Sequence, residues 1–216
     1  MQFVSLTVYF LRHGQTPFSR DDILSGGRAD PELSVEGEQM AQDFAAAYRN
    51  LPFLAIYSSP LRRTEATARP ISEALQIRPE LRDGLKEIVY GAWEGRTREE
   101  VTQQFHDDYL LWTADPAWNP PTGGETAVMV AQRAIRVIEE IRERFHDGNV
   151  LIISHKATIR IIICSLLGID VGRFRYRLGC PVGSVSILEF SNRGPLLHAL
   201  ADRMHLREAL RNVPGA

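Results

Sequence analysis

The sequence predicts an α/β fold, a three-layer sandwich in which a mostly parallel sheet carries helices on both faces. Apolar runs at 6–11, 53–57 and 149–153 are rich in β-branched, aromatic and leucine residues, which suits strands buried on both faces. Segments of helical periodicity separate these runs, and 125–145 is the clearest of them. This alternation of strands and helices is typical of parallel sheets joined by helical crossovers.

The first part of the chain provides two of these strand and helix units. After the first strand, the Gly-, Asp- and Pro-rich segment 17–31 is predicted to be a long loop. Ser34 is a favourable helix N-cap, and the helix that it begins is expected to end near Asn50. The second strand is followed by a helix over 60–75, with Pro60 in the permitted first turn.

The middle of the chain is less regular. Residues 77–81 are predicted to form a short edge strand that Pro79 interrupts. Residues 82–121 are predicted to be an inserted helical and loop cap over the site, with one helix over 97–112. The insertion belongs to a single domain, 1–216, because a chain of this length can bury one sizeable core.

The last part of the chain returns to regular structure. A strand over 150–154 leads into a helix over 156–167. Residues 184–190 alternate apolar and polar side chains like a late strand, and 196–200 are expected to pair with them as an edge hairpin.

Composition argues against several classes of partner and against a secreted protein. The formal net charge is −2 with 24% charged residues, so no global basic field points to nucleic acid or an anionic membrane. Two cysteines, Cys164 and Cys180, do not make a disulfide framework. The amino terminus lacks a basic leader and a small-residue cleavage site, and the apolar run 159–169 is too short to span a bilayer. We therefore expect a cytoplasmic protein.

Basic and imidazole side chains stand at the ends of three predicted strands. Arg12 and His13 end the first, Arg62 and Arg63 come soon after the second, and His155 follows the third. Residues just past the carboxyl ends of parallel strands converge on one crevice. A lone Arg-His pair is more often a strand cap beside a solvated histidine, but three strand ends together predict an anion site.

Five motifs occur in the order of a known family, the histidine phosphatase superfamily, also called the phosphoglycerate mutase-like family. They are Arg12-His13-Gly14, Ser58-Ser59-Pro60-Leu61-Arg62-Arg63-Thr64, Glu87 followed by Gly91-Ala92-Trp93-Glu94-Gly95, Gly123-Gly124-Glu125, and Ser154-His155. The chain resembles this family over about residues 5–190. The resemblance implies the phosphoglycerate mutase-like fold, and the sequence around Gln15 looks more like the phosphatase branch than the mutases.

The resemblance implies five catalytic residues, and their chemistry is suited to phosphoryl transfer. A neutral His13 has a lone pair for in-line attack on phosphorus. Arg12, Arg62 and His155 would offset the charge of the phosphoryl oxygens. Glu87 stands where relatives carry their proton donor to the leaving alcohol.

Two positions depart from the usual family pattern. Relatives often have glycine after the second histidine, whereas Lys156 follows here as an added cation or a solvated side chain. Many mutases have asparagine where Ser19 stands, which weakens the transfer of that phosphate contact. Arg63 is interpreted as a solvated or structural neighbour of Arg62, and an exchange of roles between the two is left open.

Further residues are expected to contact phosphate or substrate. They are Gly14, Gln15, Thr16, Ser19, Gly26, Glu125, Lys156 and His205. Glu125 is equally suited to the first turn of a helix. For His205 the alternative is an exposed position on a terminal helix.

The expected reaction needs neither a metal nor another cofactor, because the six histidines match no metal-binding spacing. The first substrate considered is phosphoserine, since similar short bacterial enzymes include phosphoserine phosphatases. Phosphoglycerate mutase activity, other small phosphoesters (sugar phosphate, phosphoglycerate, α-ribazole phosphate) and a non-catalytic binding protein are the alternatives. The expected partner is a small phosphorylated metabolite, and neither nucleic acid nor membrane is expected to bind. A homodimer is a further possibility, because dimers are common in the family that the chain resembles.

Overall fold

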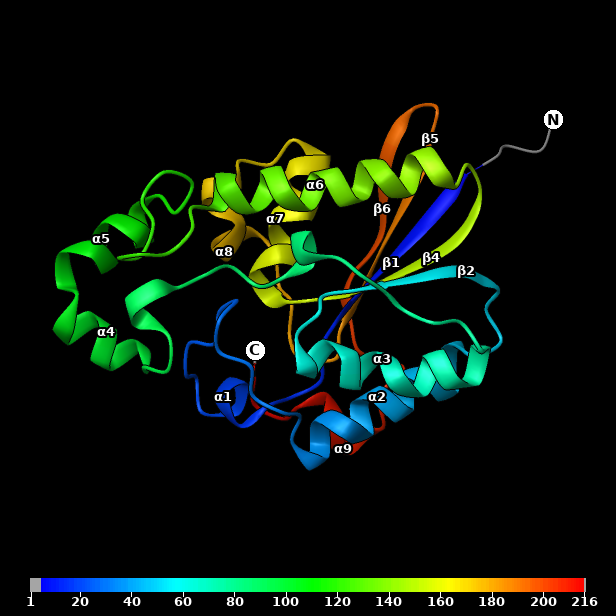
Figure 1. The fold of residues 1–216 in the computed structure, drawn as a ribbon, viewed down its shortest axis with the longest axis horizontal. Coiled ribbons are helices and arrows are strands. Elements are labelled where there is room, and N and C mark those ends of the chain that lie inside the picture. Colours follow the sequence, from blue (N-terminus) through cyan, green and yellow to red (C-terminus); the bar gives the residue numbers. More distant parts are fainter. Residues whose placement is uncertain (1–4, 216) are drawn as a thin grey trace.

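A six-stranded sheet with the order β3-β2-β4-β1-β5-β6 forms the centre of the fold (Figure 1). The computed structural model describes residues 5–215; Ala216 and residues 1–4, which the sequence analysis places before the first strand, lie outside the described part. The strands are β1 (Leu6–Arg12), β2 (Phe53–Ser58), β3 (Glu80–Leu81), β4 (Gly148–Ser154), β5 (Val185–Ser191) and β6 (Gly194–Asp202). Strands β1 to β4 pair in parallel, whereas β5 and β6 join by antiparallel pairing, which confirms the mostly parallel sheet.

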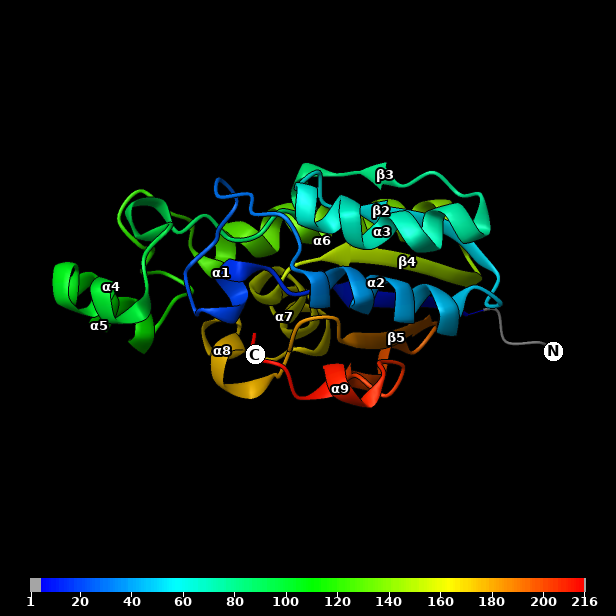
Figure 2. The same ribbon diagram turned by 90° about the horizontal axis from the view of Figure 1, so that it is seen from below.

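Helices cover both faces of this sheet (Figure 1, Figure 2). The longer ones are α2 (Val35–Tyr48), α3 (Arg62–Leu75), α6 (Ala127–Arg144) and α7 (Lys156–Leu167). Alternate side chains of β1 point to opposite layers: Phe10 packs in the core beneath α6 and α7, and Leu11 packs with Phe44 and Ile71 of α2 and α3. These two apolar layers confirm the predicted three-layer sandwich.

Shorter helices complete the chain. They are α1 (Pro17–Arg20), α4 (Arg98–Gln104), α5 (His106–Ala114), α8 (Phe174–Arg177) and α9 (Glu208–Arg211), with single 3₁₀ turns at Asp83–Leu85, Gly91–Trp93 and Val171–Arg173. Helix α1 lies inside the segment predicted to be a loop. Thr16 and Ser19 form a reciprocal capping box around it, which gives this polar segment one helical turn.

The segment 82–121 places α4 and α5 at one end of the molecule, beyond the edge of the sheet (Figure 1). The prediction of one continuous helix over 97–112 is wrong, because Phe105 leaves the helical conformation with φ −132° and ψ 43°. The break lets the ring of Phe105 pack against a small aromatic core around Trp93 and Trp112. Packing within this core therefore overrides the helical spacing.

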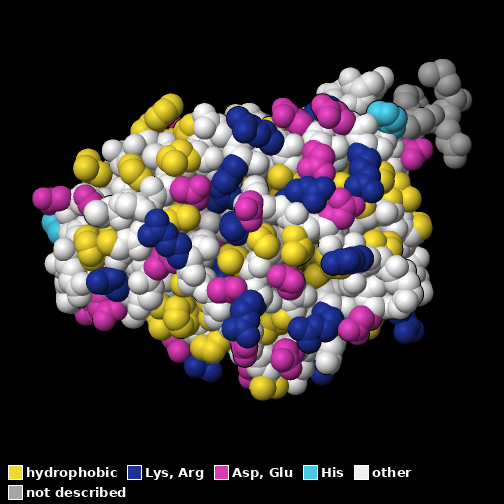
Figure 3. Space-filling view, in the orientation of Figure 1, with side chains coloured by type: hydrophobic (Ala, Val, Ile, Leu, Met, Phe, Trp, Pro, Cys, Tyr) yellow, Lys and Arg dark blue, Asp and Glu magenta, His cyan; other side chains and the backbone are white. Residues whose placement is uncertain are grey.

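Charges of both signs are interspersed over the face of the molecule drawn in Figure 3. Within residues 5–215, no helix is both long and apolar enough to cross a membrane.

Candidate active site

The carboxyl ends of β1, β2 and β4 lie next to one another and bring the two predicted histidines together. Arg12 at the end of β1 pairs with Ser154 at the end of β4, so His13 and His155 follow at the same level. Their ring centroids are 5.2 Å apart. The predicted convergence of these strand ends is confirmed.

The His13 side chain is held in one tautomer. Its Nδ1 lies 2.7 Å from the carbonyl oxygen of Gly14, which can only accept, so Nδ1 carries the proton and Nε2 keeps its lone pair. Burial lowers the pKa of His13 well below its usual value, and the cations of Arg63 and Arg12 lower it further. At neutral pH the ring is therefore uncharged and nucleophilic.

The His155 ring is held in the other tautomer, with its proton on Nε2. Nε of Arg63 donates to Nδ1 of His155 at 3.3 Å, so the proton of the ring lies on Nε2, 2.9 Å from the hydroxyl oxygen of Ser59. Burial, with the charge of Arg63 as the next cause, also lowers the pKa of His155 well below its usual value. His155 is thus a neutral hydrogen-bond donor on the Ser59 side.

The structure corrects the choice between the two adjacent arginines. The Arg62 side chain is 66% exposed and forms an ion pair with Glu32, away from the histidines. The Arg63 side chain is fully buried and donates to the carbonyl oxygens of Ala29 and Gly26 as well as to His155. Successive residues of a helix point about 100° apart, so only one of the pair can face the ends of the strands.

Arg12 presents a second buried guanidinium to the site. Its Nη1 donates to the carbonyl oxygens of Cys180 and Gly215 at 2.6 and 2.7 Å. Its Nε is buried and lacks a hydrogen-bond partner among the described residues. A buried N–H without a partner is costly, so this atom is suited to an anion bound beside His13.

Glu87 lies against the first turn of α7. Its carboxylate oxygens accept from the amides of Ile88, Ala157 and Thr158 and from the Thr158 hydroxyl, at 3.0 to 3.2 Å. These four bonds fix the position of the carboxyl group at the amino-terminal end of α7. These bonds place Glu87 in the wall of the same cavity as Arg12 and His13.

This catalytic cavity encloses about 490 Å³ of space including its mouth. Its wall is formed by Arg12, His13, Ser19, Asp22, Ile23, Leu24, Ser25, Glu87, Tyr90, Arg98 and Lys156. Burial and the neighbouring cations Arg12, Arg160 and Arg98 lower the pKa of Lys156 to about 7. Arg12, Arg98 and Lys156 thus bring positive charge to the cavity wall, beside the acidic side chains of Asp22 and Glu87.

Three other residues predicted to contact phosphate or substrate, Gly14, Ser19 and Gly26, have different roles in the structure. Ser19 lines the cavity, and Gly26 supports Arg63 through its carbonyl oxygen. The Gly14 amide donates to Thr67, and a Cβ on Gly14 would approach the Gly37 carbonyl oxygen to 2.3 Å, so only glycine fits.

Gln15 and Thr16 have structural contacts instead of the substrate contacts predicted for them. The Gln15 amide donates to the carbonyl oxygen of Pro214, and its oxygen accepts from the Ser34 hydroxyl. Thr16 is the N-cap of α1. Both side chains are buried in these interactions and lie outside the lining of the catalytic cavity.

Two further predictions of substrate contact are corrected. Glu125 forms an ion pair with Arg133 at 3.0 Å and accepts from the Val89 amide, which braces the segment that follows Glu87. His205 packs its ring against Phe44 and Tyr48, with centroids 5.7 and 5.8 Å away, in the layer below the sheet. Neither side chain lines the catalytic cavity.

Sequence reasoning missed Tyr90, Arg98 and Ser59. Ser59 directly precedes the proline of its motif, so its position at a strand end was a usable signal. Tyr90 and Arg98 reach the cavity from the irregular segment 82–121, where no periodicity indicates which side chains turn inward. Among residues 5–215, no group of three or more His, Cys, Asp or Glu side chains is arranged to hold a metal ion.

Comparison with known proteins assigns the class. The family model of the histidine phosphatase superfamily (branch 1) matches residues 8–203. The chain therefore belongs to this superfamily and is a phosphatase by class, as the five motifs predict.

Individual relatives are consistent with that class. Phosphoserine phosphatase 1 of Hydrogenobacter thermophilus is 34% identical over 182 residues, which cover 84% of this chain and 86% of the relative. Adenosylcobalamin/alpha-ribazole phosphatase of Escherichia coli is 29% identical over 81% of this chain and 87% of its own length. Among solved structures, YhfR of Bacillus stearothermophilus has a TM-score of 0.87 at 25% identity, covering 94% of this chain and all of that chain.

Proposed function

We propose that the protein hydrolyses a small phosphomonoester through a phosphohistidine formed on Nε2 of His13. The observation that carries this proposal is the hydrogen bond from Nδ1 of His13 to the Gly14 carbonyl oxygen, which leaves Nε2 free to attack. In the first step the bond from Nε2 to phosphorus forms while the bond from phosphorus to the alcohol oxygen breaks. No metal is required, since side chains supply every charge that the step needs.

Arg12 and Arg63 are proposed to bind the phosphoryl oxygens together with His155. Both guanidinium groups are buried, where a charge-assisted hydrogen bond to phosphate is stronger than in water. Negative charge spreads over the equatorial oxygens in the transition state, and fixed cations stabilise it without reorganising. Arg63 takes the role that the sequence analysis assigns to Arg62.

Glu87 is proposed to carry the proton in both halves of the reaction. It gives a proton to the departing alkoxide and then takes one from the water that attacks phospho-His13. That second attack forms a bond from water oxygen to phosphorus and breaks the bond to Nε2, so inorganic phosphate leaves and the enzyme is restored. Glu87 lines the cavity beside His13, which supports this assignment.

Phosphoserine is the first substrate to test, because a relative with 34% identity carries the name phosphoserine phosphatase. The name alpha-ribazole phosphatase on another relative supports a test of that ester. We also retain the prediction of a reducing, cytoplasmic location, which the free thiols of Cys164 and Cys180 support.

The test is phosphate release by the purified protein from a panel of phosphomonoesters, ranked by kcat/KM. His13→Ala is expected to abolish release while circular dichroism shows an unchanged fold. Release by a folded His13→Ala protein would refute the proposal. Interconversion of the two phosphoglycerates without net phosphate release would instead identify a mutase.

A further inference from the structure

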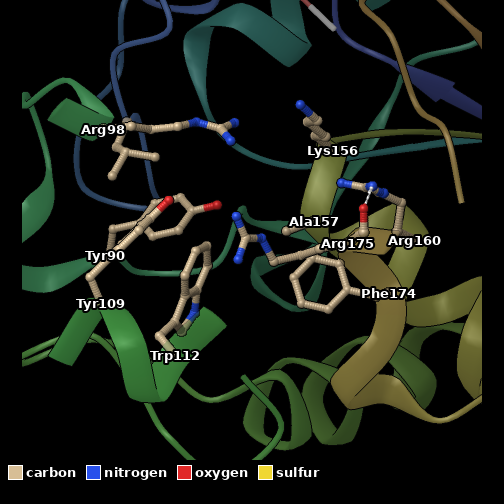
Figure 4. Close-up of a pocket in the computed structure, with 10 residues that line it drawn as sticks. Tyr90, Arg98, Tyr109, Trp112, Lys156, Ala157, Arg160, Phe174 and Arg175 are labelled. Carbon is tan, nitrogen blue, oxygen red and sulfur yellow. Dashed lines mark hydrogen bonds between the residues drawn. The ribbon is translucent and has the colours of Figure 1, made fainter. Parts of the chain in front are cut away.

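A second cavity adjoins the catalytic one, on the side formed by α5, α7 and α8 (Figure 4). The two cavities share Leu24, Tyr90, Arg98 and Lys156 in their walls, so they adjoin each other. We place the group attached to phosphorus at His13 in this second cavity, on the other side of the shared residues. We call the second space the leaving-group pocket.

The leaving-group pocket is lined by cations. Arg98, Lys156, Arg160 and Arg175 contribute to its wall, and among residues 5–215 no Asp or Glu side chain does so. Arg98 is compensated by an ion pair with Asp22 at 2.8 Å. Arg160 and Arg175 have no carboxylate within 4.0 Å in the described part of the chain.

Arg175 is held in place by an aromatic ring. Its guanidinium carbon lies 3.9 Å from the centroid of the Trp112 ring, and Figure 4 shows the group between that ring and the Tyr90 hydroxyl. Its Nη1 is buried and has no hydrogen-bond partner among the described residues. A fixed, buried and unpartnered N–H in a cavity is what a bound acceptor satisfies.

Size limits what the pocket can hold. The pocket encloses about 430 Å³ including its mouth, close to the volume of the catalytic cavity. The rings of Tyr109, Trp112 and Phe174 form much of the remaining wall. The pocket thus has room for the small alcohol of a phosphorylated metabolite.

We propose that the leaving-group pocket selects phosphate esters whose alcohol carries a carboxylate and no ammonium, with Arg175 as the residue that binds the carboxylate. The inference rests on the proposed function, because it places phosphorus at His13. A carboxylate satisfies Nη1 of Arg175 and offsets the charge of Arg160. An ammonium in the same place meets like charges and no carboxylate, so phosphoserine is disfavoured against its hydroxy-acid counterpart.

Three esters of nearly equal size test this selection. 3-Phosphoglycerate carries a carboxylate and a hydroxyl, phosphoserine replaces the hydroxyl with an ammonium, and glycerol 3-phosphate replaces the carboxylate with an alcohol. We expect kcat/KM for 3-phosphoglycerate to exceed both others by about tenfold or more, the effect of one charged hydrogen bond. Equal or faster hydrolysis of phosphoserine would overturn the proposed charge selection.

The variant Arg175→Met removes the charge and keeps an unbranched apolar side chain. We expect it to lower kcat/KM for 3-phosphoglycerate by about 10- to 100-fold and to leave glycerol 3-phosphate within about threefold. Arg177→Met is the matched control, since Arg177 is an exposed arginine of the same helix. An equal loss on all three esters would refute a role of Arg175 in recognising the carboxylate.

Binding to the His13→Ala protein separates this inference from the proposed function. Calorimetry with that protein measures 3-phosphoglycerate against glycerol 3-phosphate without turnover. Tighter binding of 3-phosphoglycerate, lost in the double variant with Arg175→Met, supports the pocket even if the wild-type enzyme hydrolyses neither ester. Equal binding of the two esters would overturn the inference while leaving the phosphohistidine mechanism untouched.

Discussion

Nε of Arg63 donates to Nδ1 of His155 at 3.3 Å, and both side chains are fully buried. This contact couples the charge of Arg63, which we propose binds phosphate, to the tautomer of the second histidine. Because Nδ1 of His155 accepts, its Nε2 carries the proton, which it donates to the Ser59 hydroxyl oxygen at 2.9 Å. One arginine thus contributes a charge of its own and fixes the proton of its neighbour.

The adjacent arginines give a paired test of this relationship. Arg63→Met is expected to lower kcat/KM for a phosphomonoester by about 10²- to 10³-fold, the loss typical of one preorganised donor. Arg62→Met is expected to stay within about threefold, because an exposed ion pair contributes little. Steady-state kinetics of both variants, with thermal unfolding as a fold control, distinguish them. A larger loss in Arg62→Met would reverse the assignment.

Glu87→Gln tests the proton donor through the leaving group. The amide keeps the size of the side chain but cannot give up a proton, so kcat for an alkyl phosphate is expected to fall by about 10²- to 10⁴-fold. p-Nitrophenyl phosphate has a leaving group that needs no protonation, and its first step is expected to be much less affected. Single-turnover kinetics with both esters measure the difference. Equal losses on the two would argue that Glu87 has no role in leaving-group protonation.

The lowered pKa of Lys156 predicts a loss of activity at alkaline pH. With a pKa lowered to about 7 by burial and by nearby arginines, its ammonium is lost as pH rises through that value. The attraction for a phosphate dianion weakens with it, so kcat/KM is expected to fall to a lower plateau above this pH. In Lys156→Gln the profile is expected to start at the lower level and to stay flat over the same interval. Identical profiles for the two proteins would show that another group titrates.

Chelation tests the absence of a metal from the mechanism. The proposed nucleophile and the proposed electrostatic groups are all side chains of this protein, so phosphate release is expected to be unchanged after dialysis against EDTA. Assays before and after dialysis, and after Mg²⁺ or Zn²⁺ is added back, make the comparison. A loss of turnover that one of these ions restores would require a metal in the reaction.

The strands and long helices follow from local patterns in the sequence. The β-branched run of β1 and the periodicity of α6 predict their elements to within about two residues, because each buries a continuous apolar surface. The break at Phe105 could not be predicted, since it depends on packing with Trp93 and Trp112. Contacts of that kind link residues that local periodicity treats separately.

In the candidate site, too, local patterns locate some residues, whereas others depend on contacts between distant segments. Arg12, His13 and Glu87 line the cavity and His155 is buried beside His13, because strand ends and motif order locate them. Arg63 and not Arg62 faces inward, because Arg63 shares the buried face of α3 with Thr67 and Ile71 at helical spacing. The contact between Trp112 and Arg175 joins α5 and α8, and nothing in either segment alone indicates it.

The most direct test of the central claim is to locate the phosphoryl group on the enzyme during turnover. The protein is mixed with a phosphomonoester, quenched within the first turnover under alkaline conditions that preserve phosphohistidine, and analysed by peptide mass spectrometry and phosphorus NMR. The account predicts a single phosphorylated residue, His13, substituted at Nε2. Phosphorylation of a different residue, or of Nδ1 of His13, would contradict it.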